Sequence, residues 1–80
     1  MSTEFANAPK VVGAKQVRRA LEGGRAARIF IARDADPQLL QPLVQKAVNL
    51  RIPVEQVDTM ELLGARCGIA VGAAIAALLR

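Results

Sequence analysis

The apolar residues of this chain of 80 residues fall into short runs that alternate with amphipathic segments, and this alternation restricts the folds open to it. Residues 29–32 are apolar between charged neighbours, which is typical of a strand buried on both faces of a sheet. Residues 52–57 predict a second strand, and Pro53 places it at the periphery of that sheet. The longest run without a charged residue, 67–79, is shorter than the roughly 20 residues of a membrane-spanning helix, so we expect a core element there and no membrane partner.

Residues 14–22 predict the first helix. Val17, Ala20 and Leu21 recur there at helical spacing on one face, which is the pattern of a helix packed on a core. Two glycines follow at positions 23 and 24, and glycine ends helices because it adopts the left-handed conformation readily. A short apolar pair at 11–12 precedes this helix.

A second helix is predicted after Pro37. Asp36 is a candidate N-cap, and proline suits the first position of a helix. Pro42 complicates this pattern, because a proline inside a helix clashes with the preceding turn. We therefore expect a brief turn after Pro37 and the main helix over 42–50. Its expected inward-facing residues are Leu43, Val44, Ala47, Val48 and Leu50.

The third helix is expected to begin after Thr59, a candidate N-cap, with Gly64 inside it or near its end. Residues 73–79 are ambiguous: alanine and leucine favour a helix, whereas the alternation of strands with helices favours one more strand. With either outcome the pattern predicts an α/β fold, a three-layer α/β/α sandwich around a small mixed sheet. We expect residues 1–9 to form a flexible leader and residues 10–80 a single domain.

The residue types that are missing exclude much chemistry. The chain has no histidine, so catalytic systems that use an imidazole to carry a proton are excluded. Cys67 is the single cysteine, which excludes an internal disulfide and a zinc site built on several cysteines. We expect a protein that is not an enzyme and uses no cofactor and no metal. Cys67 is expected to be a buried packing residue, and a free cysteine without an export signal suggests the cytoplasm.

Positive charge is concentrated in one third of the chain. The net charge is +4, and residues 10–33 contain seven basic residues against one acidic residue, Glu22. Such a concentration of charge attracts polyanions. Charge alone also fits an ordinary solvated basic helix, and the two readings stay open at this point.

Three stretches resemble the kink-turn RNA-binding family of ribosomal proteins. Residues 13–21 resemble the motif that opens its first helix, residues 31–37 resemble its strand-to-helix turn, and residues 63–72 resemble its second RNA-facing loop. Their order and spacing agree with the family over residues 10–79, and the length is similar to its bacterial branch of small YbxF- and YlxQ-type proteins. The resemblance implies a four-stranded mixed sheet in the sandwich, with the last element a strand. It also implies binding of RNA that holds a kink-turn, which consists of a stem, a bulge and tandem sheared G·A pairs.

The resemblance implies two groups of RNA-binding residues. The first lies at the start of the first helix, where glycine admits an RNA backbone and basic or amide side chains reach phosphates and guanine edges. The second is an apolar loop that packs on an unstacked base. The residues that these two groups comprise, with one acid before the second helix, are Gly13, Lys15, Gln16, Arg18, Arg19, Asp36, Gly68, Ile69, Ala70 and Val71.

Each group also has a structural interpretation. Gly13 can simply begin a helix, Asp36 can cap one, and the apolar loop can belong to the core. The sequence departs from the family at Lys15 and Gln16, where many members carry asparagine and glutamate. Because the glutamine amide both accepts and donates hydrogen bonds, this departure bears on selectivity for guanine.

We expect a small monomeric RNA-binding protein that recognises and stabilises kink-turn RNA, with ribosomal or noncoding RNA as the target and ribosome association as its setting. The alternative hypothesis is a protein-interaction adaptor that uses the same sandwich fold without specific RNA recognition. In that case the loop around Ile69 and Val71 would contact a partner protein.

Overall fold

The computed structural model describes residues 8–80, so the predicted leader at 1–9 lies mostly outside the described residues. Its elements in chain order are β1 (Lys10–Val12), α2 (Ala14–Glu22), β2 (Ala26–Ala32), α3 (Pro37–Asn49), β3 (Val54–Val57), α4 (Met60–Arg66) and β4 (Ile75–Leu79). The strands form one sheet of four in the order β1-β4-β2-β3. β3 runs parallel to β2, whereas β4 is antiparallel to both β1 and β2. The sheet is therefore mixed, as expected, and its last element is a strand.

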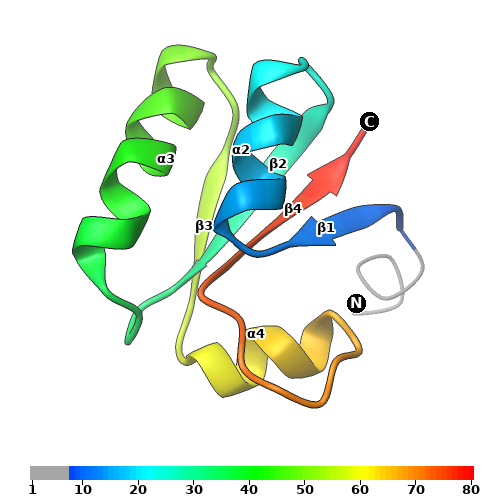
Figure 1. The fold of residues 1–80 in the computed structure, drawn as a ribbon, viewed down its shortest axis with the longest axis vertical. Helices are drawn as coiled ribbons and strands as arrows, with labels where there is room; N and C mark the ends of the chain where they lie inside the picture. The colour runs from blue at the N-terminus through cyan, green and yellow to red at the C-terminus, as the bar shows by residue number, and fades with distance from the viewer. Residues whose placement is uncertain (1–7) are drawn as a thin grey trace.

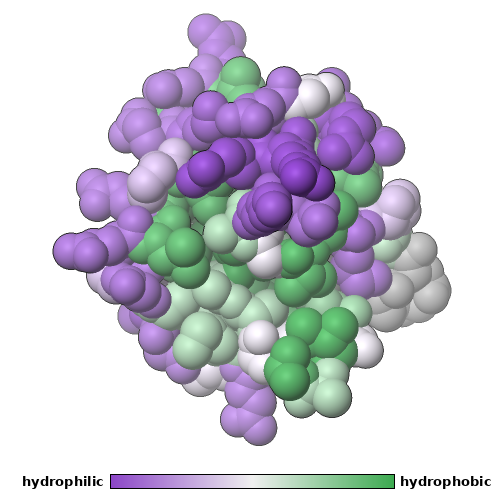
Figure 2. Space-filling model, viewed as in Figure 1, coloured by the Kyte–Doolittle hydropathy of each residue, from purple (hydrophilic) through white to green (hydrophobic). Residues whose placement is uncertain are grey.

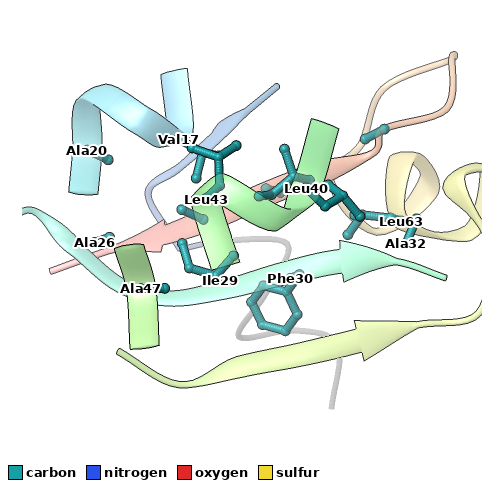
Figure 3. Close-up of a cluster of buried hydrophobic side chains, with 14 of the residues drawn as sticks. Val17, Ala20, Ala26, Ile29, Phe30, Ala32, Leu40, Leu43, Ala47 and Leu63 are labelled. Atoms are coloured by element: carbon teal, nitrogen blue, oxygen red, sulfur yellow. The ribbon is translucent and has the colours of Figure 1, made fainter. Parts of the chain in front are cut away.

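Two helices form the layer on one face of this sheet. Figure 1 shows α2 and α3 side by side in front of the strands. Within β2, the side chain of Ile29 points toward Leu43 and Ala47 of α3, whereas Phe30 points to the opposite face (Figure 3). The alternation of side chains along a strand thus gives β2 a buried residue on each face.

The third layer is α4, which packs against β2, β3 and β4 at the end of the sheet where β2 and β3 finish (Figure 1). Phe30 points away from α2 and α3 and is nevertheless buried, with an exposed fraction of 4% (Figure 3). α4 contacts the same strand. The architecture is therefore the predicted α/β/α sandwich.

The core is built from aliphatic side chains and alanine. Its largest fully buried side chains are Leu21, Ile29, Leu43, Leu63, Ile75 and Val17. Alanines fill the positions where two elements approach most closely, among them Ala20 of α2, Ala47 of α3 and Ala77 of β4, each without exposed surface. Small side chains at these positions let the helices lie close to the sheet, which compensates for the low content of aromatic residues.

The prediction of a brief turn before a helix at 42–50 was wrong, because α3 runs without interruption from Pro37 to Asn49. The carboxylate of Asp36 accepts a hydrogen bond from the backbone N–H of Gln38 (2.9 Å), which is the predicted N-cap. Pro42 removes the N–H that would have bonded the Gln38 carbonyl. Both residues are exposed, so water can satisfy that carbonyl while the buried residues of α3 hold the helix on the sheet.

The earlier start of α3 also changes which residues face inward. Leu40 is buried together with Leu43 and Ala47, an i, i+3, i+7 series on one face. Val44, which was predicted to face inward, is half-buried. The prediction that Val48 and Leu50 face inward was wrong, since their exposed fractions are 57% and 49%.

Three further local predictions were confirmed, although the strand expected over 52–57 begins only at Val54. β3 is the edge strand of the sheet, as Pro53 indicated. The hydroxyl of Thr59 accepts a hydrogen bond from the backbone N–H of Leu62 (3.0 Å) and so caps α4, and Gly64 lies inside that helix. None of the helices among residues 8–80 is long and apolar enough to cross a membrane.

Candidate functional site

Four connecting segments meet at one end of the sheet. β1, β2 and β3 finish there and β4 begins there, because β4 is antiparallel to its neighbours and β3 is parallel to β2 (Figure 1). Two backbone hydrogen bonds join these segments. The N–H of Gly13 donates to the carbonyl of Ile75 (2.9 Å), and the N–H of Ala32 donates to the carbonyl of Ala74 (2.9 Å). The start of α2 and the end of the segment 67–74 are therefore neighbours in space.

The start of α2 leaves backbone donors open. Gly13 is the N-cap residue, with φ +99°, and as a glycine it offers no capping side chain. The first turn contains no acidic residue, and a Cβ built on Gly13 would meet nothing within 4 Å. The first N–H groups of a helix have no partner within it. An anionic group can thus approach them closely, as anions do at helix N-termini.

The outer face of α2 is basic. Lys15, Arg18 and Arg19 are exposed, as is Gln16 in the first turn. The carboxylate of Glu22 lies 3.8 Å from the ammonium of Lys46, and no carboxylate of residues 8–80 pairs with these three basic side chains. Their charge is therefore available to a ligand.

The apolar loop, which we define as residues 67–72, lies beside α4, and the side chains of residues 69–71 are exposed. Ile69 and Val71 have exposed fractions of 37% and 69%, and Ala70 between them is also exposed. Gly68 adopts φ +79°, a conformation that favours glycine. The interpretation of this loop as ordinary core therefore does not hold for Ile69 and Val71. Figure 2 shows hydrophilic residues gathered over α2 and hydrophobic residues toward the end of the molecule where α4 and this loop lie.

The loop owes its position to close packing against α4. A Cβ added to Gly64 would lie 2.1 Å from the carbonyl oxygen of Val71, and one added to Gly72 would lie 3.2 Å from the Cβ of Met60. Sequence analysis placed Gly64 in the helix but missed this contact. Nothing in the local pattern indicates which backbone lies over a helical glycine, although a glycine inside a helix is itself a signal of close approach.

Both aspartates of the turn after β2 have structural partners. Asp36 caps α3, and the carboxylate of Asp34 accepts a hydrogen bond from the backbone N–H of Met60 (2.8 Å). Asp36 is exposed, and its predicted contact with RNA stays a prediction. Among residues 8–80 no group of histidine, cysteine, aspartate and glutamate side chains is placed to hold a metal ion.

Cys67 is a buried free thiol at the end of α4. Burial raises the pKa of its thiol, and the nearby Lys10 ammonium opposes that effect in part. A buried thiol with a raised pKa is a poor nucleophile at neutral pH. Cys67 is therefore a packing residue, as predicted.

The structure thus places the start of α2 and the end of the segment that follows the apolar loop at the same end of the sheet, whereas Arg19 lies in the last turn of α2. Gly13 is half-buried and the other nine predicted site residues are exposed. An uncapped basic helix and an exposed apolar loop on a small α/β sandwich define a binding module.

Comparison with known proteins gives this module a family. Residues 6–80 match the sequence profile of the Ribosomal protein L7Ae/L30e/S12e/Gadd45 family, and the chain belongs to that family. An RNA-binding protein of Geobacillus sp. (strain WCH70) is 44% identical over 70 residues, which cover 88% of this chain and 85% of the relative. The RNA-binding protein YbxF of Geobacillus stearothermophilus is 43% identical over 70 residues, with the same coverage.

A solved structure agrees on the fold. The 15.5kD RNA binding protein of Giardia lamblia superimposes with a TM-score of 0.87 and 23% identity, over 99% of this chain and 68% of that chain. The family and the relatives named RNA-binding proteins indicate a non-enzymatic protein, as expected from the sequence.

Proposed function

We propose that this protein binds structured RNA and stabilises its kink-turn form. The observation that carries the proposal is the hydrogen bond from Gly13 to Ile75, which brings the basic start of α2 and the exposed apolar loop to one end of the molecule. The relatives that are named RNA-binding proteins support RNA as the ligand. The three motifs that resemble the kink-turn-binding ribosomal proteins support the kink-turn as the feature recognised.

The start of α2 supplies the polar half of the interaction. Phosphates crowd together at a sharp bend in RNA, and the exposed ammonium of Lys15 and guanidinium of Arg19 offset their repulsion. The open N–H groups after Gly13 donate to a phosphate oxygen. Gln16 in the first turn reaches a guanine edge with an amide that both donates and accepts. Its dual character makes it less selective than a carboxylate, which only accepts.

The apolar loop supplies the second half. A bulge places at least one base outside the stack, and such a base loses contact with water when it packs on Ile69 and Val71. A straight duplex has no unstacked base, so it can bind the start of α2 but leaves Ile69 and Val71 without a partner. Binding to both halves at once therefore favours the kinked RNA, and the population shifts toward it by the difference in affinity between the two forms.

A matched pair of RNAs tests this proposal. One carries a stem, a bulge and tandem G·A pairs, and in the other Watson–Crick pairs replace the G·A pairs. We expect binding to the second RNA to be weaker by at least about tenfold, or roughly 1.4 kcal/mol. Equal affinity for the two RNAs would reduce the function to nonspecific RNA binding.

A protein partner is the second candidate, because the exposed Val71 side chain would equally suit an apolar surface of another protein. Pull-down from a lysate separates the two. A partner retained after complete nuclease digestion supports the adaptor, and loss of all partners on digestion supports RNA.

The proposal extends to a monomer in the cytoplasm that associates with ribosomes. Sedimentation of a cell extract tests this extension. Comigration with ribosomal particles that is lost on adding excess kink-turn RNA supports it, and migration as a free protein of about its own mass contradicts it.

A further inference from the structure

Met60, the first residue of α4, connects three segments of the candidate site. Its N–H donates to the carboxylate of Asp34 in the turn after β2 (2.8 Å). Its carbonyl accepts a hydrogen bond from the N–H of Ala73, just after the apolar loop (3.0 Å). Its Cβ also lies where Gly72 permits close approach. Met60 therefore ties the apolar loop to the sheet end through its backbone.

Of these two hydrogen bonds of Met60, only the one to Asp34 involves a side chain. The turn that carries it is fixed to the sheet, because the N–H of Arg33 donates to the carbonyl of Val57 (2.9 Å). α4 has only seven residues, and a helix of that length has little stability of its own. Its place depends on its contacts, and the charge-assisted bond from Met60 to Asp34 anchors its first residue.

The position of the apolar loop depends on the position of α4, because the two segments are in close contact. The carbonyl of Val71 lies directly over Gly64, at a distance that leaves no room for a methyl group. The N–H of Ile69 donates to the carbonyl of Gly64 (3.1 Å). A displacement of α4 therefore moves Ile69 and Val71 with it.

We propose that Asp34 is a positioning residue for the apolar loop: through Met60 and α4 it sets the place from which Ile69 and Val71 meet a ligand. This inference rests on the proposed function for its ligand, but the geometry can be tested without RNA. It gives Asp34 a role distinct from that of Asp36, which caps α3.

The first test compares backbone amide NMR spectra of the free protein. Asp34→Ala should shift the amides of 69–73 and speed hydrogen exchange at Met60 and Ala73, with little change at 14–22. Asp34→Asn keeps an oxygen that accepts the bond and should largely restore the wild-type spectrum. Asp58→Ala is the matched control, because it removes the same charge near α4 and Asp58 accepts no hydrogen bond from residues 8–80. Unchanged amides at 69–73 in Asp34→Ala would overturn the proposal.

The second test measures RNA affinity in double mutants. In the wild type, Val71→Ala should weaken binding about fivefold, because it removes methyl groups that become buried against the RNA base in the complex. With Asp34→Ala already present, Val71→Ala should cost less than about twofold, since the loop no longer meets the base. The penalty of Lys15→Ala should stay the same in both backgrounds. A full Val71→Ala penalty in the Asp34→Ala background would overturn the positioning role.

The two tests fail in different ways. If neither Val71→Ala nor Lys15→Ala changes binding in the wild type, the proposed RNA site is wrong, and the NMR comparison still decides whether Asp34 positions the loop. If binding responds as expected and the amides of 69–73 do not, the RNA site stands and the role of Asp34 is rejected.

Discussion

The backbone N–H of Gly13 donates to the carbonyl of Ile75 at 2.9 Å, and this bond places the N-terminus of α2 beside the start of β4. Gly13 begins a basic helix, and Ile75 follows an apolar loop more than 60 positions further along the chain. The basic start of α2 and the segment that follows the exposed apolar loop therefore share one end of a small sandwich. The predictions below test the parts of this arrangement separately.

Lys15 and Arg19 should contribute to RNA binding, whereas Arg25 should not. Lys15→Ala and Arg19→Ala each remove a phosphate contact, so affinity should fall for all RNA sequences and the slope of log K against log salt should become less negative by about 1. Arg25 is also exposed, but it lies beyond the C-terminal end of α2 and so farther from the start of the helix than Lys15 and Arg19, which makes Arg25→Ala the control. Equal losses in all three variants would show that net charge alone governs binding.

Affinity of the wild type should depend strongly on salt. If about four to six phosphates are neutralised, log K should fall against log salt with a slope of about −3 to −5. Fluorescence titrations of a labelled kink-turn RNA at several salt concentrations measure this slope. An affinity independent of salt would contradict a role for the basic face of α2.

Gly64→Ala should displace the apolar loop, because the new methyl group would lie 2.1 Å from the Val71 carbonyl oxygen. We expect a loss of about 1–3 kcal/mol in the free energy of unfolding and weaker RNA binding. Gly24→Ala is a matched control. Gly24 has φ +70°, so alanine is strained there, yet its Cβ would meet nothing within 4 Å and lies far from the site.

Denaturant unfolding and RNA titration together distinguish these two variants. Both should lose stability, and only Gly64→Ala should lose affinity under conditions where each protein is fully folded. Unchanged affinity in folded Gly64→Ala would mean that the position of Val71 does not matter for binding.

Pro42→Ala should stabilise the protein. The substitution restores an N–H that can bond the Gln38 carbonyl within α3, and it removes a ring that clashes with the preceding turn. We expect a gain of about 1–2 kcal/mol in the free energy of unfolding, after the greater freedom of the unfolded chain is subtracted. Pro37→Ala should bring no such gain, because proline suits the first position of a helix. A loss of stability in Pro42→Ala would show that the proline is required for the shape of α3.

Much of the fold followed from local patterns. The buried faces of α2 and β2 and the caps at Asp36 and Thr59 are set by residues within a few positions of one another. Pro42 misled the prediction because its local penalty is real. Packing of Leu40 and Leu43 on the sheet outweighs that penalty, and packing is not visible in a local pattern.

The candidate site also has a part that local sequence indicated and a part that depends on contacts between distant residues. Residue types and their order indicated the basic helix start and the apolar loop. The link from Asp34 to Met60 joins residues 26 positions apart, and the approach of Val71 to Gly64 depends on how the loop folds back over α4. Such contacts are set by the three-dimensional arrangement of the elements, which is why the local sequence pattern does not indicate them.

The most direct test of the shared recognition end is an NMR titration of the isotope-labelled protein with a kink-turn RNA. We predict that the amides of residues 13–19 and 68–71 shift together with a single apparent affinity, while those of 23–25 and 50–52 at the opposite end of the sheet do not move. Shifts confined to one of the two segments, or centred on the opposite end, would contradict the account.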